Sequence, residues 1–338
     1  DQSLMYVTDA FAGVHMSTDG GSNWYPSNTG ISTRVGATGD SIPIFSLTVD
    51  PNNPSIVWTG TQGRRGVFKS TDGGVTWTEK VNGIVESFGV TFRGFAVDPG
   101  DSNVVYAAAE ISSSIWAGED RPGREFDMTA GVVYKTRDGG KSWSAVWRGD
   151  DLARYVIIDP RDSDVVYVST GIFDREAANS VPESRTAGGE GVLKSTDGGA
   201  SWSNINSGIE NLYVGSLFMH PSDPDTLLAG AGNNQYWESS GAYLTTDGGA
   251  SWSRTLASQF VITSVEFAAS DPKIAYAAGP EEFHRSDDGG ITWQRVSPDG
   301  GWGPPGVRAG FPIDLEVLPS DPDTVFANNY GGGNFVSR

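Results

Sequence analysis

The chain contains no cysteine, only three histidines and no long apolar run. The lack of cysteine excludes disulfides, thiol catalysis and cysteine-ligated metals. His15, His220 and His284 lack the close spacing of a zinc-binding helix, so no metal site is expected. No segment approaches the ~18 to 20 consecutive apolar residues of a membrane span. We therefore expect neither a bound metal nor a membrane span.

Basic residues are also scarce, because Lys and Arg number 23 against 42 Asp and Glu, which gives a net charge of -19. Binding to a polyanion requires clustered cations that release its counterions, so nucleic acid is not an expected partner. The sequence has no Gly-x-x-x-x-Gly-Lys-Ser/Thr loop for a nucleotide, and we expect no cofactor. The acidic balance is typical of a soluble protein surface.

The most abundant feature is an eight-residue phrase, Ser-Thr-Asp-Gly-Gly-x-Ser/Thr-Trp, which occurs six times in nearly the same form. The copies are STDGGSNW at 17–24, STDGGVTW at 70–77, TRDGGKSW at 136–143, STDGGASW at 195–202, TTDGGASW at 245–252 and SDDGGITW at 286–293. Each copy predicts a tight turn in which the Asp carboxylate accepts backbone hydrogen bonds and the two glycines take positive φ. The Trp is expected to begin the return strand and to pack against its own hairpin.

A second recurring unit lies between these phrases and consists of two apolar runs around a Pro-containing turn, as in IFSLTVDPNNPSIVWTGT from Ile44. Together the two units predict four strands, A to D, in each repeat of about 40 to 50 residues, which is typical of a propeller blade. We therefore predict an all-β fold: a β-propeller of four-stranded antiparallel blades, with seven blades preferred over six. The expected blades are 1–28, 42–80, 91–147, 154–206, 213–256, 262–297 and 311–338, in a single domain that is expected to belong to a longer protein.

Some repeats are longer than a minimal four-stranded blade. Their additional residues lie mainly between strands B and C, at 109–131, 171–191 and 232–241. Because strand direction alternates, the A–B and C–D turns share one end of each blade, and the B–C loops lie at the other. Variable loops on a rigid scaffold tend to carry function. The candidate ligand-binding residues on these loops are Trp116, Arg121, Arg124, Asp174, Arg175, Tyr236 and Trp237.

The repeated phrase resembles the Asp-box, or BNR repeat. The alternation SLTVDPNNPSIVWTGTQGRRGVFKSTDGGVTW is similar to the propellers of xyloglucan-hydrolysing glycoside hydrolases and of sortilin-type Asp-box proteins. The resemblance covers nearly the whole chain and implies the propeller fold. It leaves the activity open, since one fold supports many functions.

The resemblance to xyloglucanases also implies a candidate catalytic residue. Those enzymes carry a catalytic Asp just after strand B of their first blade, and YVTDAFAG places Asp9 there. Glycoside hydrolysis normally uses two carboxylates. Glu110, Glu281 and Glu282 begin B–C loops and are candidates for the second, with Glu110 named first.

Two functions therefore remain open. The first is an extracellular or cell-surface module that binds a glycan or protein partner through its B–C loops, with an unknown oligomeric state. The second is a glycoside hydrolase that acts on a β-glucan such as xyloglucan, with Asp9 as one catalytic carboxylate.

Overall fold

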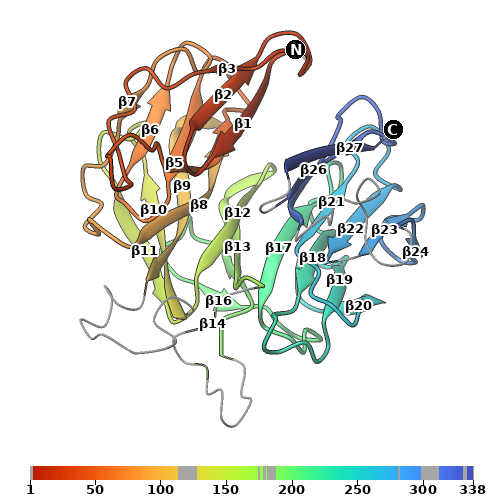
Figure 1. The fold of residues 1–338 in the computed structure, drawn as a ribbon. Coiled ribbons are helices and arrows are strands. Elements are labelled where there is room, and N and C mark those ends of the chain that lie inside the picture. Colours follow the sequence, from red (N-terminus) through yellow and green to blue (C-terminus); the bar gives the residue numbers. More distant parts are fainter. Residues whose placement is uncertain are drawn as a thin grey trace. The chain divides into compact units, whose positions relative to one another are not determined.

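The structure, a computed structural model, describes residues 3–112, 128–173, 176–177, 180, 188–280, 282–297, 312–329 and 333–337. The chain divides into two compact units, and each is described by itself (Figure 1). Unit 1 comprises Asp1–Val166 with Ser195–Trp202, and unit 2 comprises Tyr167–Lys194 with Ser203–Arg338.

The first three sheets belong to unit 1. Sheet 1 contains β1 (Met5–Asp9), β2 (Gly13–Ser17) and β3 (Tyr25–Pro26). Sheet 2 contains β4 (Ile44–Val49), β5 (Val57–Thr61), β6 (Val67–Ser70) and β7 (Thr78–Glu79). Sheet 3 contains β8 (Val90–Asp98), β9 (Asp101–Ser112), β10 (Met128–Thr136) and β11 (Ser144–Gly149).

Sheet 4 contains the boundary between the units, and the last three sheets belong to unit 2. Sheet 4 comprises β12 (Ala153–Asp159), β13 (Asp162–Thr170), β15 (Val192–Ser195) and β16 (Ser203–Asn204), while β14 (Glu176–Ala177) is a short strand in the loop before β15. Sheet 5 comprises β17 (Val214–Met219), β18 (Leu227–Ala231), β19 (Gly241–Thr245) and β20 (Ser253–Ala257). Sheet 6 comprises β21 (Ser264–Phe267), β22 (Ala275–Gly279), β23 (Glu282–Ser286) and β24 (Gln294–Arg295), and sheet 7 comprises β25 (Pro312–Val317), β26 (Val325–Asn329) and β27 (Gly333–Ser337).

These sheets confirm the predicted fold class, an all-β propeller with seven blades. Successive strands pair antiparallel, and the Asp-box turn lies between the third and fourth strands of sheets 2 to 6. Within the described residues, sheets 1 and 7 have three strands each. The assignment of the chain to a single domain stays a prediction.

The Asp-box turn has the predicted geometry, as its copy at 70–77 shows. Asp72 Oδ1 accepts the N–H of Thr76 at 2.8 Å, and Oδ2 accepts the Thr76 hydroxyl at 2.5 Å. The Ser70 hydroxyl accepts the N–H of Gly74 at 2.8 Å. Gly73 and Gly74 have φ angles of 68° and 86°, which a residue with a Cβ rarely adopts. Turn chemistry therefore accounts for the Ser, Asp, Gly-Gly and Ser/Thr positions of the phrase.

Each Asp-box turn is hydrogen-bonded to a residue at the start of strand B of its own sheet or just before it. In sheet 2 the Gly73 N–H donates to the Ser55 carbonyl at 2.8 Å. The same contact recurs in the pairs Gly20–Ser3, Gly139–Asn103, Gly198–Asp164, Gly248–Asp225 and Gly289–Lys273. At the opposite end, the B–C loop of sheet 5 contacts the D–A connections, because the Ser258 N–H donates to the Ser240 carbonyl. The two ends of a blade therefore carry different kinds of segment, as predicted.

The Asp-box tryptophans differ from expectation, since they join neighbouring sheets. The Trp143 indole N–H donates to the Lys80 carbonyl of sheet 2 at 2.9 Å, and Trp143 is 4% exposed. Trp77, Trp202 and Trp252 make the same kind of bond to the preceding sheet. Trp24 in sheet 1 instead bonds to Gly21 of its own turn and is 38% exposed. The ring lies between sheets because that is where its large apolar area is covered.

A cation directly precedes the Ser or Thr of four Asp-boxes, and the sequence analysis did not assign it a role. These residues are Lys69, Lys135, Lys194 and Arg285. The Lys194 ammonium lies over the ring of Tyr167 and donates to the Gly248 carbonyl of the next sheet at 3.0 Å. The cation therefore ties its own sheet to the following Asp-box.

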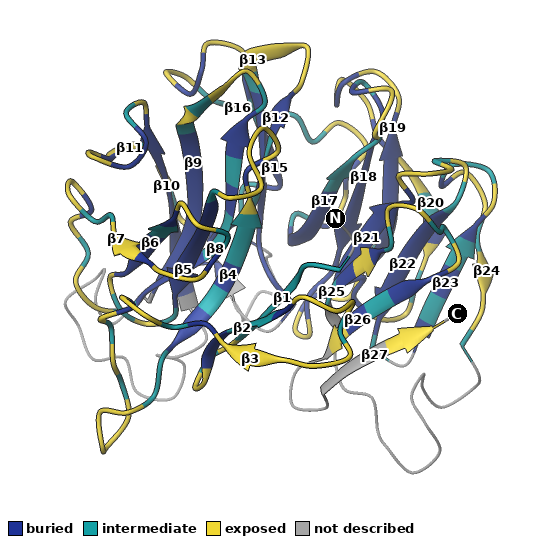
Figure 2. Cartoon of the chain, turned by 90° about the horizontal axis from the view of Figure 1, so that it is seen from above, coloured by how far each residue is buried: buried dark blue, intermediate teal, exposed yellow. Residues whose placement is uncertain are grey.

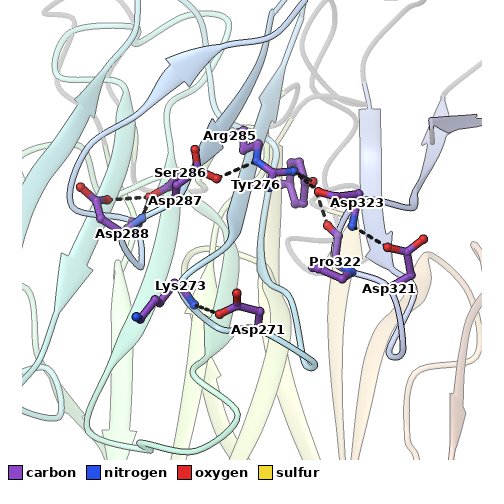
Figure 3. A network of polar contacts seen from close by, with 11 residues as sticks. Asp271, Lys273, Tyr276, Arg285, Ser286, Asp287, Asp288, Asp321, Pro322 and Asp323 are labelled. Atoms are coloured by element: carbon purple, nitrogen blue, oxygen red, sulfur yellow. Dashed lines mark hydrogen bonds and ion pairs between the residues drawn. The ribbon is translucent and has the colours of Figure 1, made fainter.

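In sheet 6 the cation is Arg285, which takes part in a polar network with sheet 7 (Figure 3). Its guanidinium donates to the Tyr276 hydroxyl at 2.7 Å and to the Asp323 carboxylate at 2.5 Å. The Tyr276 hydroxyl in turn donates to the Pro322 carbonyl at 2.8 Å. This network fixes the turn between β25 and β26 against sheet 6.

The hydrophobic core lies between the faces of adjacent sheets. One cluster joins sheets 2 and 3 and includes Trp58, Phe92, Phe95, Tyr134 and Trp143. Other clusters join sheets 1 and 2, sheets 5 and 6, and sheets 6 and 7. The strands β3 and β7 are exposed, as are Val336 and Ser337 at the end of β27 (Figure 2). Stability therefore comes from neighbouring repeats, as expected for a repeat architecture.

Acid is expected to weaken the Asp-box turns. The hydrogen bonds from the Thr76 hydroxyl, the Thr76 N–H and the Ser70 hydroxyl lower the pKa of Asp72 to about 2. A lowered folded-state pKa stabilises the fold above the unfolded value near 3.8, and this contribution is lost as the pH falls towards about 2. Turn hydrogen bonds lower the pKa to about 2 in the same way at Asp138, Asp197, Asp247 and Asp288.

The measurement is the thermal unfolding midpoint of the wild type and of Asp72→Asn between pH 7 and pH 2. We expect Asp72→Asn to lower the midpoint at pH 7 and to flatten its decline below pH 4. Asp150→Asn is the control, because Asp150 is an exposed carboxylate outside the turns. Identical profiles for the wild type and Asp72→Asn would contradict the prediction.

Candidate functional site

Asp9 ends β1 and lies at the start of the B–C loop of sheet 1. Its Oδ1 accepts the N–H groups of Phe11 and Ala12, both at 2.7 Å, which closes a local turn. The residue is exposed. The structure therefore gives Asp9 a turn-forming role and leaves the carboxylate accessible to solvent.

Glu110 lies near the end of β9 and is held by an arginine. The Arg93 guanidinium donates to Glu110 Oε2 through Nε at 2.8 Å and through a second nitrogen. Arg93 also stacks over the ring of Phe45, with 4.4 Å between the guanidinium carbon and the ring centroid. The side chains of Arg93 and Glu110 are 5% and 11% exposed. Glu110 is therefore engaged in a covered ion pair, which disfavours its prediction as a second catalytic carboxylate.

Glu282 belongs to unit 2 and begins β23. It is 7% exposed and accepts a hydrogen bond from the Ser258 hydroxyl. Burial raises the pKa of this carboxyl group. Six of the predicted site residues lie outside the described part of the chain: Glu281, Trp116, Arg121, Arg124, Asp174 and Arg175. Their predicted roles stay predictions.

The loop end of unit 1 carries exposed aromatic side chains that the sequence analysis did not single out. Phe11 is 73% exposed and Phe88 is 52% exposed. The Arg64 guanidinium lies 4.3 Å from the centroid of the Phe88 ring, and a backbone bridge pairs the two residues. The D–A connection before β8 thus supports the B–C loop of sheet 2. Such a contact keeps Phe88 oriented while leaving half of it open to solvent.

The loop end of unit 2 presents Trp237, which is 50% exposed. The Asn211 side-chain amide donates to the carbonyls of Tyr236 and Glu238 at 2.7 and 2.9 Å, on both sides of the Trp. Ser239 follows with a φ of 59°, the one positive φ at a non-glycine position among the described residues. Backbone strain of this kind persists only where the surroundings enforce it. The turn therefore holds Trp237 in a fixed, outward position.

Hydroxyl contacts add to the rigidity of this turn. The Ser239 hydroxyl donates to Glu210 Oε2 at 2.5 Å. The Tyr243 hydroxyl donates to the Ser239 carbonyl at 2.6 Å. A carboxylate, Glu210, is thereby held at the turn that carries the exposed indole. We call residues 236–240 the Trp237 turn.

Tyr236 was predicted to bind ligand together with Trp237, but the structure buries it. It is 4% exposed, and its ring stacks on Tyr213 with a centroid distance of 5.4 Å and an interplanar angle of 13°. Tyr213 in turn contacts Ala177 and Ser180 of the preceding B–C loop. The ring of Tyr236 therefore supports the turn from within, because its face is already covered by Tyr213. Of the two aromatic side chains predicted in this loop, Trp237 is the one that faces solvent.

Unit 1 also has a hollow of about 380 Å³ at the Asp-box end, between sheets 3 and 4. It is lined by Lys135, Arg137, Asp138, Trp143 and neighbouring turn residues. Desolvation, followed by the charge of Arg137, lowers the pKa of Lys135 to about 8. The Lys135 ammonium nevertheless donates to the Gly198 carbonyl at 2.6 Å. Two of the residues that line this hollow, Lys135 and Trp143, are thus already occupied in joining sheets.

In the part of the chain that the structure describes, no group of three or more His, Asp or Glu side chains is arranged to hold a metal ion. In the same residues, no helix has the length and apolar character needed to cross a membrane.

Comparison with protein families gives two matches. The protein-family model described as Sortilin, neurotensin receptor 3 (Sortilin-Vps10) matches residues 131–285. The family model of the BNR/Asp-box repeat matches residues 284–295. The BNR match covers the sixth Asp-box phrase, at 286–293, and the sortilin match covers the third to the fifth.

Curated relatives are xyloglucanases. Xyloglucanase Xgh74A of Acetivibrio thermocellus is 24% identical over 310 residues, which cover 80% of this chain and 34% of the relative. A xyloglucanase of Hypocrea jecorina is 29% identical over 258 residues, which cover 67% of this chain and 28% of the relative. The chain thus spans about a third or less of the length of these relatives.

Solved structures with the same fold include YCF48 bound to D1 peptide, with a TM-score of 0.63 and 16% identity, covering 100% of this chain and 90% of that one. An ancestral GH74 enzyme has a TM-score of 0.64 and 18% identity, covering 97% of this chain and 42% of that one. At these identities the likeness shows the fold.

Proposed function

Because the chain is an Asp-box β-propeller that resembles xyloglucanases and sortilin-type domains, we propose that it is an extracellular or cell-surface binding module for a glycan partner. The observation that carries the proposal is the exposed Trp237, held outward on a rigid turn of the loop end. Aromatic faces are apolar platforms, and neighbouring carboxylates accept hydrogen bonds from hydroxyl groups. Both features occur together at the Trp237 turn.

Rigidity supports this proposal, because a pre-formed site loses little conformational entropy on binding. Asn211 fixes the backbone on both sides of Trp237, and Tyr236 packs beneath the turn against Tyr213. Glu210 is held beside the turn by Ser239. A β-glucan chain that stacks on the indole would find an acceptor at Glu210 without rearrangement of the loop.

Hydrolysis of a β-glucan is the second candidate function, favoured by the xyloglucanase relatives. Asp9 is exposed at the position that the resemblance assigns to a catalytic carboxylate. Glycosidases place a second carboxylate roughly 5 to 9.5 Å from the first. Glu110 is committed to Arg93, so it is a poor candidate for that second group. We therefore propose glycan binding ahead of β-glucan hydrolysis.

Replacing Trp237 with alanine tests the binding proposal. We expect the affinity for xyloglucan oligosaccharides, measured by isothermal titration calorimetry, to fall by about tenfold or more, since exposed aromatic anchors dominate such interfaces. The unfolding midpoint should change little, because half of the side chain is already in solvent. Tyr25→Ala is the matched control: it removes another exposed aromatic side chain, on β3, and should leave binding unchanged.

Two outcomes would count against the proposal. Equal affinity of the wild type and Trp237→Ala would exclude the Trp237 turn as the binding surface. Release of reducing sugar from xyloglucan by the wild type but not by Asp9→Ala would instead favour the hydrolase.

A further inference from the structure

Within the described residues, the first strands of sheets 6 and 7, β21 and β25, are joined by side-chain hydrogen bonds rather than by a strand ladder. The Ser264 hydroxyl on β21 accepts the N–H of Leu315 on β25 at 3.1 Å. Glu266 Oε1, two residues further along β21, accepts the N–H of Val317 at 3.1 Å. One carboxylate oxygen of Glu266 is thus used to satisfy the free edge of β25.

The second carboxylate oxygen of Glu266, Oε2, does not bond to β25. Glu266 is 6% exposed, and its Oε2 is buried without a hydrogen-bond partner. Desolvation, followed by the charges of Glu316 and Asp314, raises the pKa of Glu266 well above its ordinary value. An unpaired buried carboxylate oxygen is costly, because the lost hydration is not replaced. A native structure that retains such a group calls for a reason.

Two further carboxylates lie beside Glu266. Glu316 occupies the same register in sheet 7 as Glu266 in sheet 6, since Glu266 pairs with Tyr276 and Glu316 pairs with Phe326. Asp314 is two residues before Glu316 and therefore shares its side of β25. The Ser264 hydroxyl reaches Asp314 Oδ1 at 3.5 Å, which places Asp314 next to β21. We call Glu266, Asp314 and Glu316 the inner carboxylate cluster.

The inner carboxylate cluster contains one buried side chain, Glu266, and one exposed side chain, Glu316. Glu316 is exposed, so the cluster can be reached from solvent. Desolvation and then the charge of Asp314 nevertheless raise the pKa of Glu316 to about 8, although the side chain is exposed. Like charges that crowd together disfavour their ionised forms until a cation compensates them.

Two other covered carboxylates of this chain have such a cation. Glu110 is paired with Arg93, and Glu86 is paired with Arg148 at 2.7 Å. Within the described residues, Glu266 has no Lys, Arg or His partner. In the same residues, no group of side chains is arranged to hold a metal ion.

We propose that the inner carboxylate cluster binds a guanidinium or ammonium group of a ligand, with Glu266 Oε2 and the Glu316 carboxylate as acceptors. A planar guanidinium has several N–H donors and matches two neighbouring carboxylates, as Arg93 does for Glu110. The site is separate from the Trp237 turn and does not depend on glycan binding. It assigns to the protein a second binding surface, for a cationic peptide side chain.

The test is calorimetric titration of the full chain at pH 7.5 with L-argininamide, and with L-citrullinamide as the probe that lacks the guanidinium charge. We expect argininamide to bind the wild type and to bind Glu266→Gln and Glu316→Gln about tenfold to a hundredfold more weakly, because one charge-assisted contact is lost. Glu79→Gln, which alters an exposed carboxylate of β7, should behave as the wild type.

Glu266→Gln keeps an oxygen that can accept the Val317 N–H, so it is expected to fold. Glu316→Gln changes an exposed side chain and provides a second variant that tests the same site. Absence of argininamide binding to the wild type, or equal binding by both Gln variants, would overturn the proposal. Binding of calcium chloride without binding of argininamide would overturn it in favour of a metal.

Discussion

Replacement of Trp143 by alanine is expected to lower the free energy of unfolding by about 3 to 5 kcal/mol, the range found for large aromatic side chains removed from a core. Trp143 is 4% exposed and packs edge-on against Trp58, with 5.8 Å between the ring centroids. Its indole N–H also donates to Lys80 of the preceding sheet. The change therefore leaves a cavity and an unpaired carbonyl between sheets 2 and 3.

Trp24→Ala is the matched control, because it alters the same position of the first Asp-box. Trp24 is 38% exposed and its indole bonds within its own turn, so we expect a loss below about 1 kcal/mol. Urea unfolding followed by circular dichroism would measure both variants. Similar losses at the two positions would show that the Trp stabilises its own hairpin rather than the contact between sheets.

Replacement of Arg93 by methionine is expected to destabilise the fold by about 3 to 5 kcal/mol, since it leaves the covered Glu110 carboxylate without its partner. The guanidinium supplies two hydrogen bonds to Glu110 and the stacking contact with Phe45, and both are lost together. Methionine keeps much of the side-chain volume. The loss therefore reports mainly on the unpaired charge.

The double variant Arg93→Met/Glu110→Leu separates charge from packing. When both members of a covered ion pair are replaced by apolar residues, stability often returns to near the original value. We expect the double variant to recover most of the loss in the same urea experiment. A double variant as unstable as Arg93→Met alone would show that the ion pair is needed for packing and would contradict this account.

The repeated phrase made the turn predictable because its chemistry is local. Asp72, Gly73 and Gly74 act within five residues of one another, so their hydrogen bonds and φ angles follow from the sequence. The strand order within each blade followed for the same reason, since short turns join consecutive antiparallel strands. Neither inference required knowledge of which blades touch.

The sites were harder to predict because they depend on neighbours distant in the sequence. Tyr236 and Trp237 are adjacent and similar in composition, yet Tyr213 covers one while the other stays half exposed. The sequence placed Glu110 at the start of a B–C loop, but it could not show that Arg93 on β8 lies beside this carboxylate. A cation before four of the Asp-boxes was visible in the sequence, but its target lies one blade further on.

By itself, the sequence determined the repeating unit of this protein, its turns and its all-β class, because these rest on contacts between residues a few positions apart. The tertiary structure alone decided which aromatic rings are buried, which carboxylates have a cation and which do not, as at Glu266. Burial and charge pairing depend on contacts between sheets. Those contacts join residues roughly one blade apart, as Trp143 does with Lys80.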